Sequence, residues 1–318
     1  LNMNKMKFSI IFLFFVITAI KADDDIPKVY FTKKITPEQV VEMFKILKKD
    51  LKGNVAIKVH SGEKGNKNFI GPDYLKPIVE YLKGTIVECN TAYGGSRGTT
   101  QNHEQVMKEH GWSTNFNSDI LDSEAPDITL KIPNGNIIKE NYVGKHMAKY
   151  NSCLVVSHFK GHIMGGFGGA LKQLAIGFGS SAGKTWQHSC GKSKTLGEMM
   201  KYSCPDKEFK AAMADAAWSV VDYFKGNMAF INLMKNISVD CDCDGNAKPP
   251  VMADIGILSS TDPVALDQAC LDLIEKSNDS GKDALLNRIN SKLGPLIIDY
   301  SVKLGTGKKE YELINVDN

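Results

Sequence analysis

Apolar residues along this chain follow two spacings, the continuous runs of buried strands and the three-to-four-residue period of amphipathic helices. Thr36-Pro37-Glu38-Gln39 has the form of a capping box with proline at the first helical position, so a helix is predicted from there to about Leu51. The first third of the chain thus predicts strand, helix, strand, helix and strand over residues 28–32, 37–51, 54–60, 73–83 and 85–89. That order is typical of a mostly parallel, helix-covered sheet.

The remainder of the chain continues the alternation. Asp262 is the predicted N-cap of the last long helix. Further strands are predicted over 153–157, 228–234 and 255–258, and further helices over 102–110, 209–224 and 263–276. No repeat, low-complexity stretch or Pro/Gly-rich linker marks a boundary, so the sequence indicates a single α/β domain over residues 23–318. Whether it forms one body or two lobes around a cleft stays open.

The first 22 residues have the layout of a secretory signal peptide. Asn4-Lys5-Met6-Lys7 is a short basic region, and an apolar run of 13 residues follows from Phe8 to Ile20. That run is shorter than the roughly 20 residues that cross a bilayer, so an uncleaved anchor is the weaker alternative. We expect a secreted protein, or one of the cell envelope or secretory-pathway lumen, with no stable membrane insertion after removal of residues 1–22.

The balance of acidic and basic residues limits which kinds of partner are expected. The chain has 39 Lys+Arg against 36 Asp+Glu, but Lys5, Lys7 and Lys21 fall in the signal segment, which has no acidic residue. The rest is therefore formally neutral, at 36 against 36. Nucleic-acid affinity depends mainly on Lys and Arg contacts to phosphates, so we expect no nucleic-acid partner but a small anionic ligand held by a few residues.

Seven cysteines are too few for a disulfide-built scaffold of this length. Cys153 and Cys270 sit in apolar runs typical of buried positions. Cys190 and Cys204 can pair in an oxidising compartment, which the sequence leaves undecided.

The densest candidate chemistry follows the predicted strand over 153–157. Four glycines in five positions, Gly165, Gly166, Gly168 and Gly169, lie between His162 and Lys172. Glycines at this density let backbone N–H groups approach a ligand, and loops at the carboxyl ends of strands are where open α/β sheets bind ligands. Neither the Walker nor the dinucleotide spacing fits. The alternative is a glycine-rich turn with solvated histidines.

A second candidate site is the run Asp240-Cys241-Asp242-Cys243-Asp244-Gly245. Alternation in an extended segment places Cys241 and Cys243 on one side and the aspartates on the other. Two thiolates suit soft metals or an iron–sulfur cluster, whereas carboxylates, to which Asp254 can add, suit calcium or magnesium. A four-cysteine cluster would require Cys190 and Cys204 as well. A structural acidic turn is the alternative.

The glycine-rich loop carries a resemblance to known families. His162, Gly166-Phe167-Gly168-Gly169, Lys172 and His188 are similar to the core of the nickel-dependent lactate racemase superfamily. More extensively, the mature chain resembles the family known as domain of unknown function 362, sometimes attached to iron–sulfur modules, over nearly all of residues 28–318. The segments that carry this resemblance are 90–95, 157–162, 165–172, 240–243, 254–258 and 262–268.

The racemase resemblance implies roles for individual residues. Lys172 occupies the position of the lysine that tethers a nickel-pincer nucleotide, His188 that of the nickel ligand, and His162 that of a proton-exchanging histidine. Gly94-Gly95-Ser96-Arg97 resembles a G-T-H-R motif with serine in place of the second such histidine. Either His103 takes over that role, or the chemistry differs, or the site only binds.

We therefore expect a cleft in which Arg97 and Lys184 suit an anionic ligand. The leading hypothesis is an exported metal- or cofactor-dependent enzyme that acts on a small oxygenated, hydroxy-acid-like substrate, with racemase, epimerase or oxidoreductase chemistry. The alternative is a non-catalytic metal-binding or iron–sulfur electron-transfer protein. Nickel or an iron–sulfur cluster is the expected cofactor, with calcium at the acidic run the weaker choice.

The signal segment gives the first prediction. N-terminal sequencing of the protein recovered from expressing cells should place the mature N-terminus within a few residues of Asp23. Recovery of peptides containing Lys5 or Lys7 from the mature protein would contradict it.

Overall fold

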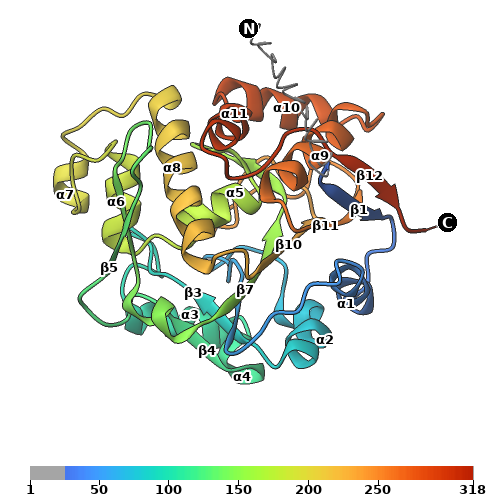
Figure 1. Ribbon diagram of the computed structural model, residues 1–318, viewed down its shortest axis with the longest axis horizontal. Coiled ribbons are helices and arrows are strands. Elements are labelled where there is room, and N and C mark those ends of the chain that lie inside the picture. The colour runs from blue at the N-terminus through green and yellow to red at the C-terminus, as the bar shows by residue number, and fades with distance from the viewer. Residues whose placement is uncertain (1–25, 318) are drawn as a thin grey trace, which may run out of the picture.

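A computed structural model describes residues 26–317 and is built on one eight-stranded sheet (Figure 1). The strand order is β12-β1-β11-β10-β7-β2-β3-β4. The strands are β1 Lys28–Thr32, β2 Val55–Lys58, β3 Thr85–Glu88, β4 Ser118–Ile120, β7 Ser152–His158, β10 Met228–Met234, β11 Gly256–Ser260 and β12 Glu312–Asn315. The predicted signal peptide, residues 1–22, lies outside the described part of the chain.

Five of the neighbouring strand pairs in this sheet are parallel, and β11 is antiparallel to both β1 and β10. The predicted α/β class with a mostly parallel sheet is therefore confirmed. Two short antiparallel ribbons accompany the sheet, formed by β5 Ile128–Lys131 with β6 Glu140–Val143 and by β8 Lys160–His162 with β9 Gly166–Gly168.

Helices cover both faces of the sheet because alternate strand residues point to opposite sides (Figure 1). In β7, Leu154 and Val156 pack with helices α1 and α2, whereas Cys153 and Val155 pack with α8 and α9. The helices are α1 Pro37–Lys45, α2 Pro72–Leu82, α3 Thr100–Glu109, α4 Trp112–Asn115, α5 Ala170–Lys172, α6 Ser181–His188, α7 Leu196–Met199, α8 Asp206–Phe224, α9 Pro263–Glu275, α10 Lys282–Ser291 and α11 Leu296–Lys303. Within residues 26–317, no helix has the length and apolar content that a membrane span requires.

Two predicted caps are confirmed. Thr36 Oγ1 accepts a hydrogen bond from the Gln39 N–H at the start of α1, and Asp262 accepts from two N–H groups at the start of α9. The predicted extension of α1 to Leu51 is wrong. The helix ends at Lys45, and Lys48 adopts a left-handed backbone with φ of 50°, which turns the chain toward β2.

The carboxyl ends of β2, β3, β7 and β10 meet at one edge of the sheet because these four strands run parallel. The loops that leave this edge contain His60, Arg97, His162 and Cys243. In open α/β sheets this edge is the usual place for a ligand site.

Candidate functional site

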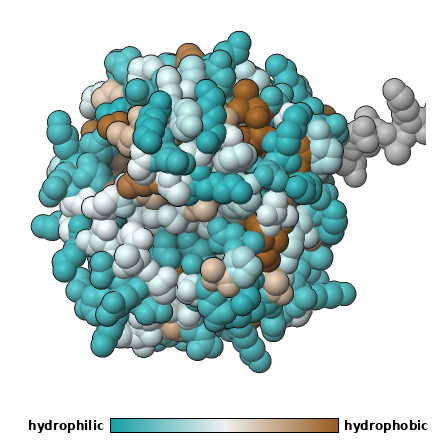
Figure 2. Space-filling model, turned by 90° about the vertical axis from the view of Figure 1, so that its left-hand side faces the viewer, coloured by the Kyte–Doolittle hydropathy of each residue, from teal (hydrophilic) through white to brown (hydrophobic). Residues whose placement is uncertain are grey.

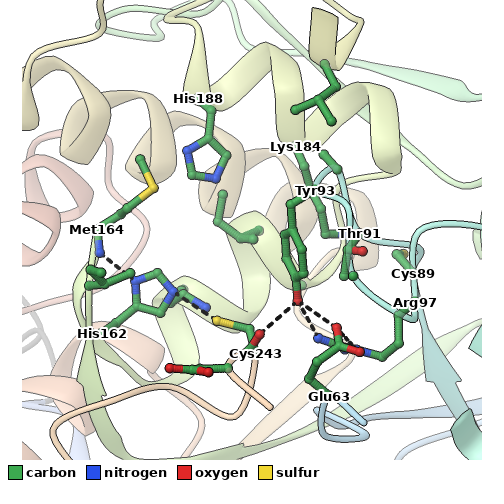
Figure 3. Close-up of a pocket in the computed structure, with 18 of the residues that line it drawn as sticks. Glu63, Cys89, Thr91, Tyr93, Arg97, His162, Met164, Lys184, His188 and Cys243 are labelled. Atoms are coloured by element: carbon green, nitrogen blue, oxygen red, sulfur yellow. Dashed lines mark hydrogen bonds and ion pairs between the residues drawn. The ribbon is translucent and has the colours of Figure 1, made fainter. Parts of the chain in front are cut away.

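A cavity of about 870 Å³ lies at the carboxyl edge of the sheet (Figure 3). It is lined by loops after β2, β3 and β10, by the β8–β9 turn, and by α5, α6 and the α7 region. The polar and ionisable residues of its lining are His60, Glu63, Glu88, Thr91, Tyr93, Arg97, His162, Lys172, Gln173, Lys184, His188, Cys243 and Asp244. The cavity thus brings together His162, Lys172, His188, Arg97 and Lys184, which the sequence predicted to share a cleft, and adds Cys243 from the second candidate site.

A buried ion pair holds the β10–β11 loop at this edge. The Asp242 carboxylate is fully buried and lies 2.7 Å from Lys160 Nζ and 2.9 Å from His158 Nδ1. Burial alone would raise the pKa of Asp242, but His158 and Lys160 lower it well below its usual range. The carboxylate therefore anchors the loop and is not a free metal ligand, contrary to the sequence-based expectation.

The other predicted carboxylate ligands also have protein partners. Asp240 pairs with Arg288 Nη1 at 3.0 Å. Asp254 pairs with Lys235 Nζ at 3.1 Å and accepts the Asn236 N–H at 2.7 Å. Neither residue lines the cavity, so the structure does not assemble the predicted acidic metal site.

The two cysteines of this loop lie against His162. The sulfur atoms of Cys241 and Cys243 and a ring nitrogen of His162 are all within 4.8 Å of one another. His162 Nε2 is 3.8 Å from Cys243 Sγ (Figure 3). The Cys243 N–H donates to Cys241 Sγ at 3.4 Å. Thiolate and imidazole groups at this spacing suit a soft transition metal.

The backbone fixes which nitrogen of His162 carries the proton. His162 Nδ1 accepts the N–H groups of Met164 at 3.1 Å and Gly165 at 2.7 Å. In a neutral ring, Nε2 must then carry the hydrogen and direct it toward the sulfur atoms. Burial, and then Lys172, lower the pKa of His162 to about 4, so the ring is neutral near pH 7. His162 therefore faces the cysteine pair as a hydrogen-bond donor.

The pKa values of Cys241 and Cys243 are shifted in opposite directions. A hydrogen bond from Cys243 lowers the pKa of Cys241 well below its usual range despite burial, and Lys172 and His162 lower it further. The same hydrogen bond raises the pKa of Cys243 well above its usual range. The hydrogen bond between the two side chains therefore favours the thiolate form on Cys241 over that on Cys243.

Lys172 and His188 line the cavity together with His162, as the sequence predicted. Neither the Lys172 amine nor the His188 ring forms a hydrogen bond or ion pair with any residue between 26 and 317, although His188 stacks on Phe209 at 4.5 Å. Burial lowers the pKa of His188 to about 3, with His162 and Lys172 adding to the effect. Both side chains are therefore available to a ligand.

The four glycines of the loop serve packing in this structure. Gly166 has φ of +84°, and a Cβ there would lie 2.6 Å from Gly294 Cα. A Cβ on Gly169 would lie 2.5 Å from Asp267 Oδ1, and Asp267 accepts the first N–H groups of α5, the helix that carries Lys172. Gly165 lies against His162 and Gly168 against Lys160. The glycines thus let the loop pack closely, and none of the four lines the main cavity.

Arg97 and Lys184, the two residues predicted to bind an anion, already have hydrogen-bond partners within the protein. The Arg97 guanidinium donates to Glu63, to Glu88 and to the Tyr93 hydroxyl. Lys184 Nζ donates to the Gly179 carbonyl at 2.5 Å. Arg97 therefore organises the cavity wall, and Lys172 is the lining cation without a partner among the described residues.

His103 is not part of the cavity lining. Its ring is fully buried, with Nε2 3.3 Å from Ser61 Oγ and Nδ1 3.3 Å from Asn90 Oδ1. The expectation that His103 could replace the missing histidine at Ser96 does not agree with this placement. The second histidine near the cysteines is His60, which lines the cavity and interacts with Cys241.

The polar lining also includes His60, Glu63, Glu88, Thr91, Tyr93 and Gln173, none of which the sequence singled out as a site residue. His60 had a usable signal, because it ends the predicted strand over 54–60 at the edge where ligands bind. Tyr93 had none, because its hydroxyl reaches Glu63 and the Cys243 carbonyl through loop contacts (Figure 3).

Cys190 and Cys204 form a disulfide, which resolves the pairing that the sequence left open. The bond closes the segment that contains α7, and Cys204 lines the cavity. It also removes both sulfur atoms from the ligands available for a four-cysteine cluster.

Fold and site together define an α/β protein with a cysteine- and histidine-containing cavity at the carboxyl edge of a mostly parallel sheet. The chain belongs to the family described as domain of unknown function 362, whose model matches residues 55–272. The expected family is confirmed, over a shorter span than 28–318. No curated protein matches this sequence significantly.

Two solved structures show distant similarity. The lactate racemase apoprotein from Thermoanaerobacterium thermosaccharolyticum is 17% identical with a TM-score of 0.41, covering 64% of this chain and 50% of that chain. A protein from Thermotoga maritima is 10% identical with a TM-score of 0.41, covering 80% of this chain and 59% of that chain. This chain therefore spans about half the length of the racemase.

Replacing the anchoring carboxylate should destabilise the protein. Asp242→Asn leaves Lys160 and His158 buried without a counter-charge, so the free energy of unfolding in urea should fall by about 3 kcal/mol or more. Asp240→Asn, which breaks a partly exposed pair, is the matched control and should cost about 1 kcal/mol or less. Equal effects would contradict the anchoring role of Asp242.

Stability should also fall in mild acid because of His103. Burial lowers the pKa of His103 to about 3, whereas the unfolded side chain has the ordinary value of 6.5. The unfolded state therefore binds the extra proton first, and the stabilisation present above pH 6.5 is lost as the pH falls. His103→Gln should reduce the loss of unfolding free energy between pH 6 and pH 5 by about 1 kcal/mol, measured by urea titrations. An unchanged pH dependence would contradict this assignment.

Proposed function

We propose that this protein is a metal-dependent enzyme that acts on a small oxygenated acid, by racemase, epimerase or oxidoreductase chemistry. One observation carries the proposal. One cavity contains Lys172 and His188, two polar groups without a hydrogen-bond partner within residues 26–317, and is also lined by Cys243, whose sulfur lies within 4.8 Å of the Cys241 sulfur and a His162 ring nitrogen. Side chains with no internal partner in a partly buried cavity are typical of a ligand site.

The residues present fit a soft metal. Cys241 and Cys243 offer two sulfur ligands that lie within 4.8 Å of each other and of a His162 ring nitrogen. His188, a neutral imidazole with both ring nitrogens unpartnered within residues 26–317, lines the same cavity but is not part of this group. His162 fits less well as a ligand, because its Nδ1 is already an acceptor and its Nε2 bears the proton. It fits better as a hydrogen-bond donor that tunes the sulfur ligands.

The cavity also fits the tethered cofactor that the sequence resemblance implies. Lys172 and His188 would hold a nickel-pincer nucleotide, since neither has a hydrogen-bond or ion-pair partner among residues 26–317 and both line a cavity of about 870 Å³. When bound, such a group would accept and return a hydride from the carbon next to a carboxylate. The spacing of His162, Lys172 and His188 along the chain supports this choice.

The chain's own residues would bind and orient the substrate. His162 holds a proton at Nε2 that can be donated to a substrate oxygen. His60 also lines the cavity and interacts with the Cys241 sulfur. The Lys172 ammonium would neutralise a carboxylate when it is not joined to a cofactor. Arg97, fixed by Glu63 and Glu88, keeps the wall rigid.

The second candidate function is non-catalytic metal or iron–sulfur binding for electron transfer. The Cys241–Cys243 pair favours metal binding of some kind. The Cys190–Cys204 disulfide argues against a four-cysteine cluster, because it leaves two cysteines beside His162. We further propose that the protein is exported, on the signal-like composition of residues 1–22.

Metal content and the mass of the Lys172 peptide test the proposal. Natively purified protein should contain a soft transition metal, and Cys241→Ser with Cys243→Ser should lower the bound metal at least tenfold by elemental analysis. Cys153→Ala, which removes a buried sulfur in β7 outside the cavity, is the control and should leave metal content unchanged.

The outcomes separate the two functions. Nickel together with a covalent adduct on Lys172 supports the enzyme, whereas iron with acid-labile sulfide and an unmodified Lys172 supports the electron-transfer alternative. Metal content that is unaffected by removal of both thiols would overturn the proposed site.

A further inference from the structure

Large apolar side chains are exposed preferentially at the mouth of the cavity. Between residues 26 and 317, eleven large hydrophobic side chains are exposed, and six of them line this one cavity. The six are Tyr93, Ile163, Met164, Leu196, Met200 and Tyr202. Because single exposed apolar residues are ordinary but such a concentration is not, this apolar rim indicates a binding function.

The rim is assembled from three separate parts of the chain. Tyr93 follows β3, Ile163 and Met164 form the β8–β9 turn, and the remaining three belong to α7 and the turn after it. The Cys190–Cys204 disulfide closes this last segment. On the side of the molecule that bears α7, brown apolar patches interrupt a largely hydrophilic surface (Figure 2). Met200 is the most exposed of the rim residues, at 77%.

The floor of the same cavity has the opposite character. Lys172 lines the cavity together with His162, His188 and Lys184. Figure 3 shows the last three, with the Met164 N–H on the rim directed at His162. The cavity of about 870 Å³ lies within the size range of sites for ligands of roughly drug size. An acid of three or four carbons held at Lys172 would leave the apolar rim without contacts.

We propose that the natural substrate is an amphipathic organic acid, with its carboxylate at the Lys172 floor and an apolar tail of several carbons against the rim. This inference rests on the proposed function for the kind of substrate, an organic acid, and on the rim for the tail. Lys172 takes the carboxylate when its amine is not joined to a cofactor. The rim residues line a concave cavity that continues into the polar floor, which fits one small molecule that spans both regions.

Binding of a homologous series tests the tail. Straight-chain carboxylates from butanoate to decanoate, kept below their micelle concentrations, are titrated calorimetrically into the full-length protein as purified. Affinity should rise by about fourfold for each added methylene while the tail is being buried, and then level off. Straight-chain alcohols of equal length test the head group and should bind at least tenfold more weakly, because they lack the charge that the lysine floor attracts.

Substitutions at the rim, compared with a control elsewhere on the surface, test where the tail binds. Leu196→Ser combined with Met200→Ser should flatten the dependence on chain length, while butanoate binding changes less than twofold. Leu313→Ser on β12 is the control, since Leu313 is exposed at 39% against 40% for Leu196 and lies outside the cavity. This control should retain the full dependence on chain length.

Three results would overturn the inference. The first is an affinity that does not change with the chain length of the carboxylate. The second is an equal loss of chain-length dependence in the Leu313→Ser control. The third is a Leu196→Ser, Met200→Ser double variant that loses binding to anionic lipid vesicles but keeps the chain-length dependence. The last result would assign the rim to a membrane surface. Metal content is measured on the same preparations. A protein that contains no metal but still shows the chain-length dependence would refute the proposed metal-dependent enzyme and leave the amphipathic ligand in place.

Discussion

The arrangement of the site depends on one buried carboxylate. Asp242 is surrounded by protein and can remain ionised there only because Lys160 and His158 approach it from the β7–β8 segment. The two cysteines stand on either side of this residue in the chain, so the ion pair that satisfies Asp242 also sets the position of both sulfur atoms. Their placement beside His162, which ends β8, follows from the same contact.

Close backbone packing then determines the chemical state of His162. The turn between β8 and β9 can direct two N–H groups at His162 Nδ1 because neither of its glycines has a side chain. Gly165 lies against the His162 ring, and Gly166 lies against Gly294. With Nδ1 committed as an acceptor, the ring presents N–H to the sulfur atoms. The glycines thus influence the chemistry indirectly, through a tautomer, although the main cavity is lined by other residues.

Much of the fold was predictable because strands and helices depend on local patterns. Strands β1 and β10 have the predicted bounds, and Thr36 and Asp262 cap helices as expected. His162, Lys172 and His188 were also predictable, since they lie in one glycine-rich segment. The aspartates were misassigned because a sequence shows that a carboxylate is present but not that Lys160, Arg288 or Lys235 neutralises it. His60 was missed because its proximity to Cys241 arises from the pairing of β2 with β7.

The charges of the cavity bear on the proposed chemistry. Arg97 and Lys58 together balance Glu63 and Glu88, and burial keeps His162 and His188 neutral near pH 7. The other lining groups that can carry charge include Lys172, Lys184, Asp244 and Cys243. An acid substrate would add negative charge to a partly buried space beside the cysteine pair, and like charges there repel strongly. A bound metal cation would add positive charge at the same place, so the proposed metal would favour binding of the proposed acid substrate.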